Sequence, residues 1–150
     1  MDKSKALPGH LLLVKPTLET PFHISHDWWE QTGRDFRVEL RAHLCAEHRS
    51  VYEEHFDTEV IDWVDERTGE VTPVDGLQHI IREHCSQQSE YLSDDVPLID
   101  AVFRVLIANG NKPLMCSELA ERSGKSAKRI LRTLSGSRIY KGLRPAAEGS

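Results

Sequence analysis

The sequence predicts an α+β protein with a mixed first part and a mainly helical second part. Apolar residues recur at i, i+3, i+4 and i+7 over residues 97–109 and again over residues 125–134, which is the period of an amphipathic helix. In residues 59–75, Val60, Asp62 and Val64 alternate with Ile61 and Trp63, and the pair Thr68-Gly69 marks a turn, which is typical of a β-hairpin. The two periods occupy different parts of the chain, so we expect strands and helices to be segregated.

The net charge also differs between the first and the second part of the chain. Residues 93–150 contain ten lysines and arginines against six acidic residues, a net charge of +4, whereas residues 1–92 contain nine against eighteen, a net charge of −9. The polar run that precedes Pro97 is the natural join. We therefore assign residues 10–92 to an N-terminal α+β module and residues 96–145 to a C-terminal module.

The elements of the first part follow from local patterns. The hydrophobic run at its start reads as a strand, Asp27 is a candidate cap for a turn that stops near Gly33, and Asp75 is a candidate cap for a helix after the hairpin. The expected ranges are a strand over 11–16, one continuous helix over 34–50, a hairpin over 59–75 and a helix over 76–88.

The second part reads as three helices and a strand. After the helix over 97–109, a short helix over 114–124 ends at Gly124. The next helix starts after Ser126 and stops near Gly136. Residues 137–145 are short and broken by a glycine, so they favour a strand or a hairpin arm.

The helix over 125–134 carries two opposed stripes. Ala127, Ile130, Leu131 and Leu134 share one side, and the basic residues repeat the same spacing two positions earlier. At about 100° per residue, this shift turns the basic stripe roughly 200° away from the apolar stripe. One face is therefore expected in the core and the other in solvent, a geometry suited to a nucleic-acid groove.

Together, the run "PL…SELAERSG…RILRTLSG…IYKG" resembles the winged helix-turn-helix domain of bacterial regulators, over about the last third of the chain. The resemblance implies a transcriptional regulator, or a factor associated with one, that binds duplex DNA. A DNA binder of this size is expected to dimerise, because one recognition helix reads few base pairs. The residues expected at the DNA are Lys125, Ser126, Lys128, Arg129, Arg132, Arg138 and Lys141.

A protein-interaction adaptor is the alternative reading. Basic stripes are often only solvated helix faces, and a helix-turn-helix can dock on a polymerase, a ribosome or a sister subunit instead of DNA. The acidic first half favours this reading, because its net charge of −9 would weaken the attraction to a duplex. In either reading the N-terminal module is a candidate platform for a protein partner.

Histidines and cysteines cluster in the first part. Cys45 and His48 lie one helical turn apart, the usual C-x-x-H half of a zinc site, and the adjacent pair His84 and Cys85 is the natural second half. Adjacent helical residues project about 100° apart, so both can bind one ion only if the helix end has opened. A structural Zn²⁺ would add folding free energy to a small polar module.

Other readings of this cluster remain open. One of His84 and Cys85 can bind alone, with His43, His55 or His79 completing the ligand set. The same residues can be ordinary core or surface side chains, and a Cys45–Cys85 disulfide is a further alternative. Cys116 is far in sequence from the others, and we expect it to serve in packing.

The sequence favours a non-enzymatic protein. Cys45-Ala46-Glu47 resembles the C-A-E element of zinc-dependent deaminases, but the P-C-x-x-C of that family is absent. G-x-S-x-G, H-E-x-x-H and a complete phosphate-binding glycine loop are also absent, which leaves a zinc hydrolase or deaminase as the weakest alternative. An odd cysteine count, no signal-peptide pattern and no long apolar run predict a cytoplasmic protein without a membrane span.

Overall fold

The computed structural model describes residues 15–51, 60–64 and 67–146. These residues form helices and small antiparallel strand pairs, which agrees with the predicted α+β class. In chain order the elements are β1 (Phe22–Ile24), α1 (His26–Thr32), α2 (Phe36–Ala42), α3 (Ala46–Val51), β2 (Val60–Val64), β3 (Val71–Asp75), α4 (Gly76–Glu83), the 3₁₀ turn η2 (Cys85–Gln87), α5 (Leu98–Ala108), α6 (Cys116–Ser123), α7 (Ala127–Leu134) and β4 (Leu143–Pro145).

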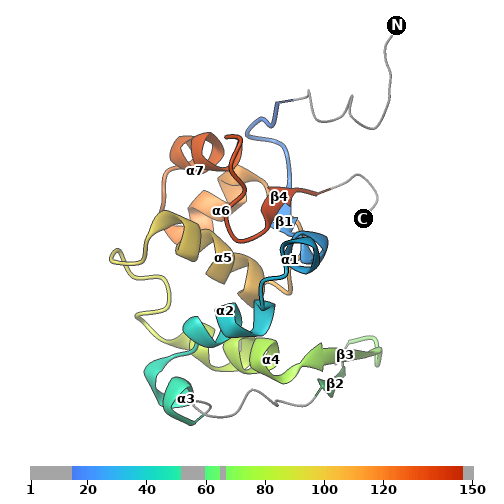
Figure 1. Ribbon diagram of the computed structural model, residues 1–150. Helices are drawn as coiled ribbons and strands as arrows, with labels where there is room; N and C mark the ends of the chain where they lie inside the picture. Colours follow the sequence, from blue (N-terminus) through green and yellow to red (C-terminus); the bar gives the residue numbers. More distant parts are fainter. Residues whose placement is uncertain (1–14, 52–59, 65–66, 147–150) are drawn as a thin grey trace, which may run out of the picture.

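One hydrophobic core joins the two predicted modules. Leu40 of α2 and Leu77 of α4 belong to the same buried cluster as Phe103 of α5, Leu119 of α6 and Ile130 of α7. In Figure 1, α5 lies between the α6–α7 pair above it and α2 and α4 below it. The predicted division between residues 92 and 96 therefore falls within a shared core.

The C-terminal strand pairs with the start of the described chain. β1 and β4 are antiparallel, with Phe22 opposite Pro145 and Ile24 opposite Leu143. On its other side, Phe22 makes a β-bridge to Leu114, in the turn between α5 and α6. The predicted strand within residues 137–145 is confirmed, but its partner comes from the far end of the chain and not from a local hairpin. β1 thus lies between β4 and the α5–α6 turn.

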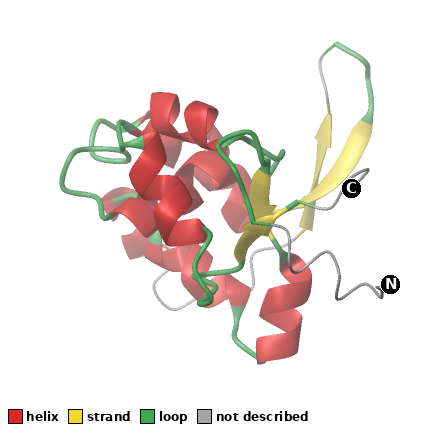
Figure 2. Ribbon diagram, turned by 90° about the horizontal axis from the view of Figure 1, so that it is seen from above, coloured by secondary structure: helices red, strands yellow, loops and turns green. Residues whose placement is uncertain are grey.

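The predicted hairpin over residues 59–75 is confirmed in its described residues. β2 and β3 are antiparallel, with Val60 opposite Asp75 and Val64 opposite Val71. Gly69 has a φ of 75°, a left-handed conformation that glycine adopts without strain, which explains the Thr-Gly signal at this turn. Figure 2 shows the hairpin extending away from the helices.

The first part differs from the prediction at several helix ends. Residues 34–50 form two helices, because the chain turns inward at His43 and Leu44, whose side chains are buried. Ser25 caps α1 instead of Asp27, since its hydroxyl accepts a hydrogen bond from the Trp28 N–H at 3.2 Å. The helix predicted over 76–88 ends at Glu83 and continues as η2. Residues 11–14 of the predicted first strand lie outside the described residues.

The helices of the second part form where the sequence predicts them. Ser126 caps α7, its hydroxyl accepting a hydrogen bond from the Arg129 N–H at 3.3 Å, and Ser135 ends the helix one residue before the predicted stop. Gly124 ends α6 with a φ of 77°. The α6–turn–α7 unit packs on α5 through the buried faces that the periodicity indicates.

Candidate metal centre and candidate nucleic-acid surface

Cys45 and His48 face each other at the start of α3. Cys45 immediately precedes the helix and His48 lies in it, three residues later, so the two side chains project from the same side. The Cys45 Sγ and the His48 Nδ1 are 3.3 Å apart. This is the first half of the predicted zinc site, with the side chains directed as the spacing requires.

The second half is formed where α4 ends. The helix stops at Glu83, His84 takes φ −126° and ψ −61°, and Cys85 begins η2. The helix end is therefore open, which is the condition under which adjacent residues can approach one ion. The Cys85 Sγ lies 3.9 Å from the His48 Nδ1 and accepts a hydrogen bond from the Cys45 N–H at 3.2 Å.

Three of the four predicted ligands form one group. The donor atoms of Cys45, His48 and Cys85 all lie within 4.8 Å of one another. His84 stands beside them, its ring edge-on to the His48 ring at a centroid distance of 4.4 Å. The His84 Nε2 is 3.4 Å from a carboxylate oxygen of Glu47, and these two residues form a second donor group with His48.

The chemistry of the first group suits a soft divalent cation. Thiolate and imidazole are the ligands that Zn²⁺ prefers, and the site lacks the oxygen-rich set that Mg²⁺ or Ca²⁺ requires. Burial raises the pKa of the Cys85 thiol to about 11. A bound cation would favour its thiolate form, because the positive charge of the ion compensates the lost hydration.

The other histidines considered as ligands are placed elsewhere or not described. His43 is buried and turned away from this group, donating from its Nε2 to a Glu39 carboxylate oxygen at 2.7 Å. His79 lies on α4 outside both donor groups, within the part of the chain that the structure describes. His55 lies outside the described residues.

A further group of possible metal ligands, which contains two carboxylates, surrounds the Lys141 ammonium. Glu39, His43 and Asp100 converge as metal ligands can. Lys141, however, forms ion pairs with Glu39 and with Asp100, the latter at 3.0 Å. Burial would raise the pKa of Glu39, but hydrogen bonds from His43 and Lys141 and the charge of Lys141 lower it to about 2. Lys141 thus supplies the positive charge that this cluster needs, and no local sequence pattern indicates this pairing.

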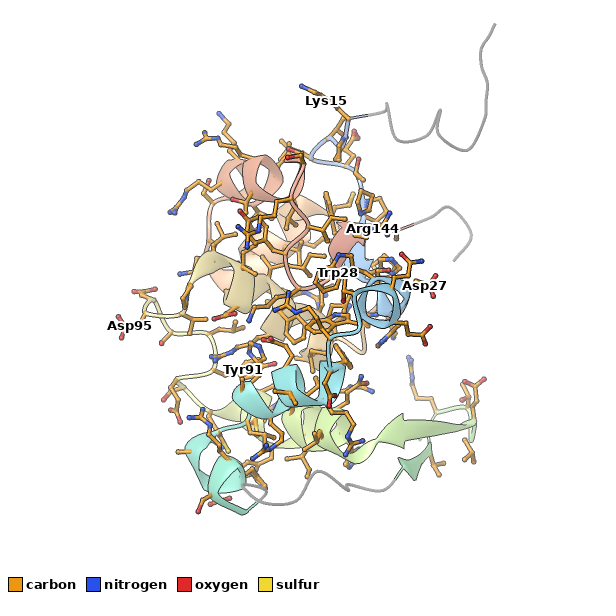
Figure 3. The ribbon with its side chains drawn as sticks, viewed as in Figure 1. Lys15, Asp27, Trp28, Tyr91, Asp95 and Arg144 are labelled. Carbon is orange, nitrogen blue, oxygen red and sulfur yellow. The ribbon has the colours of Figure 1, made fainter. Side chains whose placement is uncertain are left out.

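The basic face of α7 is exposed as predicted by the two stripes. Ile130 is fully buried and Leu134 nearly so, while Lys128, Arg129 and Arg132 are exposed. Figure 3 shows nitrogen-tipped side chains projecting outward from this helix. Helix α3, which carries His48, and α7 lie at opposite ends of the molecule in Figure 1.

Comparison with protein-family models, curated proteins and solved structures gives no match. Among the described residues, no helix combines the length and the apolar character needed to cross a bilayer.

The predicted DNA-contact residues that flank α7 differ in their exposure and in the contacts that they already make. Arg138 is exposed, with its guanidinium 5.2 Å from the Tyr140 ring centre. The Lys125 ammonium donates to the Asp94 carbonyl at 3.3 Å. Ser126 is exposed, but its hydroxyl serves as the cap of α7. Because Lys141 is held by two carboxylates, we leave it out of the candidate surface.

Proposed function

We propose that this chain is a non-enzymatic nucleic-acid-binding protein. It contacts duplex DNA through α7 and acts in transcriptional control. The observation that carries the proposal is the exposed basic face of α7, formed by Lys128, Arg129 and Arg132. On the opposite face of the helix, Ile130 and Leu134 pack into the hydrophobic core and hold α7 in place. A cationic helix held rigidly against a second helix by a tight turn is the arrangement with which helix-turn-helix proteins enter the major groove.

Flanking residues extend the proposed surface along the backbone of the duplex. We expect Lys125, just before the cap of α7, and Arg138, after the end of the helix, to contact phosphates on either side of the groove. Such contacts release counterions, so the affinity is expected to fall steeply with salt. Two copies of the chain would bind half-sites about one helical turn apart.

Changing Arg129 and Arg132 together to Ala is expected to weaken duplex binding at least tenfold and to reduce the salt dependence by about two counterions. Both side chains are exposed, so the melting temperature should stay within a few degrees of wild type. Fluorescence anisotropy with a mixed-sequence duplex, titrated from about 50 mM to about 200 mM salt, measures both quantities.

The matched control changes Arg34 and Arg67 to Ala, which removes the same charge from exposed positions outside α6 and α7. Equal weakening by both double variants would mean that only net charge matters and that α7 is not the contact surface. No duplex binding by wild type even at low salt would reject the DNA proposal and favour the adaptor reading, which the acidic first half supports.

We further propose that Cys45, His48, Cys85 and His84 hold a structural Zn²⁺ ion. The first three already present their donor atoms to one another, and His84 lies against His48 at the open end of α4. The ion would supply charge compensation to two thiolates and fasten α3 to the end of α4. These segments are separated in sequence by the hairpin, so the link would add stability that local structure cannot supply.

Metal analysis of the purified protein is expected to find about one Zn²⁺ per chain, and a chelator should lower the melting temperature by more than 10 °C, as a structural zinc contributes several kcal/mol. Cys85→Ser should lose the metal, whereas His79→Ala, a histidine on α4 outside the group, should retain it. A metal-free protein whose melt is unchanged by chelator would reject the zinc proposal.

A further inference from the structure

We infer that Cys45 and Cys85 form an oxidative modification site, at which a peroxide converts the two thiols into one disulfide. The release of metal that this implies rests on the proposed zinc centre, but the disulfide itself does not. The inference stands on the placement of two thiols from different segments, both near the His48 ring, of which only Cys45 is partly exposed.

The geometry brings the two sulfur atoms close without joining them. They lie within 4.8 Å of each other and must approach to about 2 Å to bond. The Cys45 N–H already contacts the Cys85 Sγ at 3.2 Å, so the backbone of one residue touches the sulfur of the other. Cys45 lies in the turn before α3 and Cys85 at the break after α4, and neither is fixed inside an α-helix.

The two thiols differ in access, which sets the order of the steps. Cys45 is partly exposed and hydrogen-bonded to the His48 Nδ1 at 3.3 Å, whereas Cys85 is fully buried. Cys45 is therefore the thiol that a small peroxide meets. Cys85 is the resolving thiol, shielded from the peroxide but next to the product of the first step.

The reaction balances with one peroxide. The Cys45 sulfur attacks one peroxide oxygen and the O–O bond breaks. The leaving hydroxide takes the proton that the Cys45 thiol gives up, which yields one water and a Cys45 sulfenic acid. The Cys85 sulfur then displaces that hydroxyl, which leaves as a second water with the proton of the Cys85 thiol. Two thiols are oxidised by two electrons in total, and hydrogen peroxide is reduced to two molecules of water.

Metal binding and disulfide formation exclude each other at this site. A sulfur in the disulfide no longer offers a thiolate, so only the two histidines of the proposed ligand set would remain. A bound Zn²⁺ would in turn slow oxidation by engaging both sulfurs. Oxidation would therefore release the ion from the end of α4.

Cys116 provides a control within the same chain. It lies on α6, is fully buried, and burial raises the pKa of its thiol. Cys116 belongs to none of the donor groups in the described residues. Hydrogen peroxide should leave Cys116 as a free thiol.

The test treats the full-length protein, metal-free and zinc-loaded, with hydrogen peroxide, then alkylates the denatured chain and maps peptides by mass spectrometry. In the metal-free protein we expect alkylation to fall from three thiols to one, with a peptide pair linked through Cys45 and Cys85. Cys85→Ser should instead accumulate sulfenic acid at Cys45, and Cys45→Ser should block oxidation of Cys85. Zinc loading should slow the reaction several-fold and release the ion as the disulfide forms.

The outcomes separate this inference from the zinc proposal. A Cys45–Cys85 disulfide in metal-free protein, together with no zinc uptake, supports the modification site and rejects the zinc proposal. Zinc uptake without any Cys45–Cys85 disulfide, or oxidation of Cys116 at the same rate, overturns the modification site and leaves the zinc proposal intact.

Discussion

At the scale of single residues, a buried polar network joins parts of the chain that are distant in sequence. The His43 Nε2 donates to Glu39, and its Nδ1 accepts a hydrogen bond from the Arg104 Nε at 3.0 Å. Arg104 also donates to the Tyr91 carbonyl at 2.9 Å. Glu39 completes the network by pairing with Lys141, next to β4.

Glu39 gives this network a pH dependence. Its pKa is lowered to about 2 in the folded protein against about 4.5 in the unfolded chain. Stabilisation by Glu39 is therefore complete above about pH 5 and is lost as the pH falls toward 2, with an upper bound of about 3 kcal/mol. Glu39→Gln is expected to destabilise the protein at neutral pH and to flatten the decrease in stability below pH 5, measured by urea unfolding across that range.

Glu121→Gln on α6 is the control, because Glu121 is exposed and lies outside the network. It should leave both the neutral-pH stability and the acid decrease as in wild type. If Glu39→Gln lost stability on acidification as steeply as wild type does, the ion pair with Lys141 would not persist in solution.

At the scale of elements, the sequence predicts best where the signal is local. Helix α7 is predicted nearly to the residue because its period, its cap at Ser126 and its apolar face all lie within ten residues. The hairpin is predicted for the same reason, from alternation around Gly69. The break between α2 and α3 is missed, because residues 34–50 keep a helical pattern while the burial of His43 and Leu44 in the shared core decides the turn.

The residues of the candidate metal centre could be predicted from the sequence, but their complete spatial arrangement could not. The spacing of Cys45, just before α3, and His48, within it, predicts that their side chains face each other, and the structure has them 3.3 Å apart. Whether His84 and Cys85 could join them depended on where α4 ends, and this is set by tertiary contacts. Lys141 was beyond prediction for a similar reason. Its carboxylate partners are 102 and 41 positions away, so a local pattern assigned it to the basic surface.

At the scale of the whole molecule, the start and the end of the described chain are bound together. β1 lies between β4 and the α5–α6 turn, where the Asn111 side chain both accepts from the Ile24 N–H and donates to its carbonyl. The Trp29 indole N–H donates to the Lys141 carbonyl, and the ring packs so closely on Gly142 that a Cβ there would lie 2.8 Å from it. The segments that precede α6 and follow α7 thus depend on contacts with residues 22–29, at the start of the described chain.

A fragment of residues 96–150 is therefore expected not to fold alone, although the charge and the helical pattern mark this part as a module. It lacks Phe22, Ile24 and Trp29, all nearly or fully buried. Their burial contributes roughly 5–8 kcal/mol, comparable with the whole stability of a small domain. We expect a broad, non-cooperative melt by circular dichroism and poorly dispersed amide signals by NMR, in contrast to the full chain. A cooperative melt with dispersed signals would instead show that α5, α6 and α7 form an independent domain to which β1 and α1 only add.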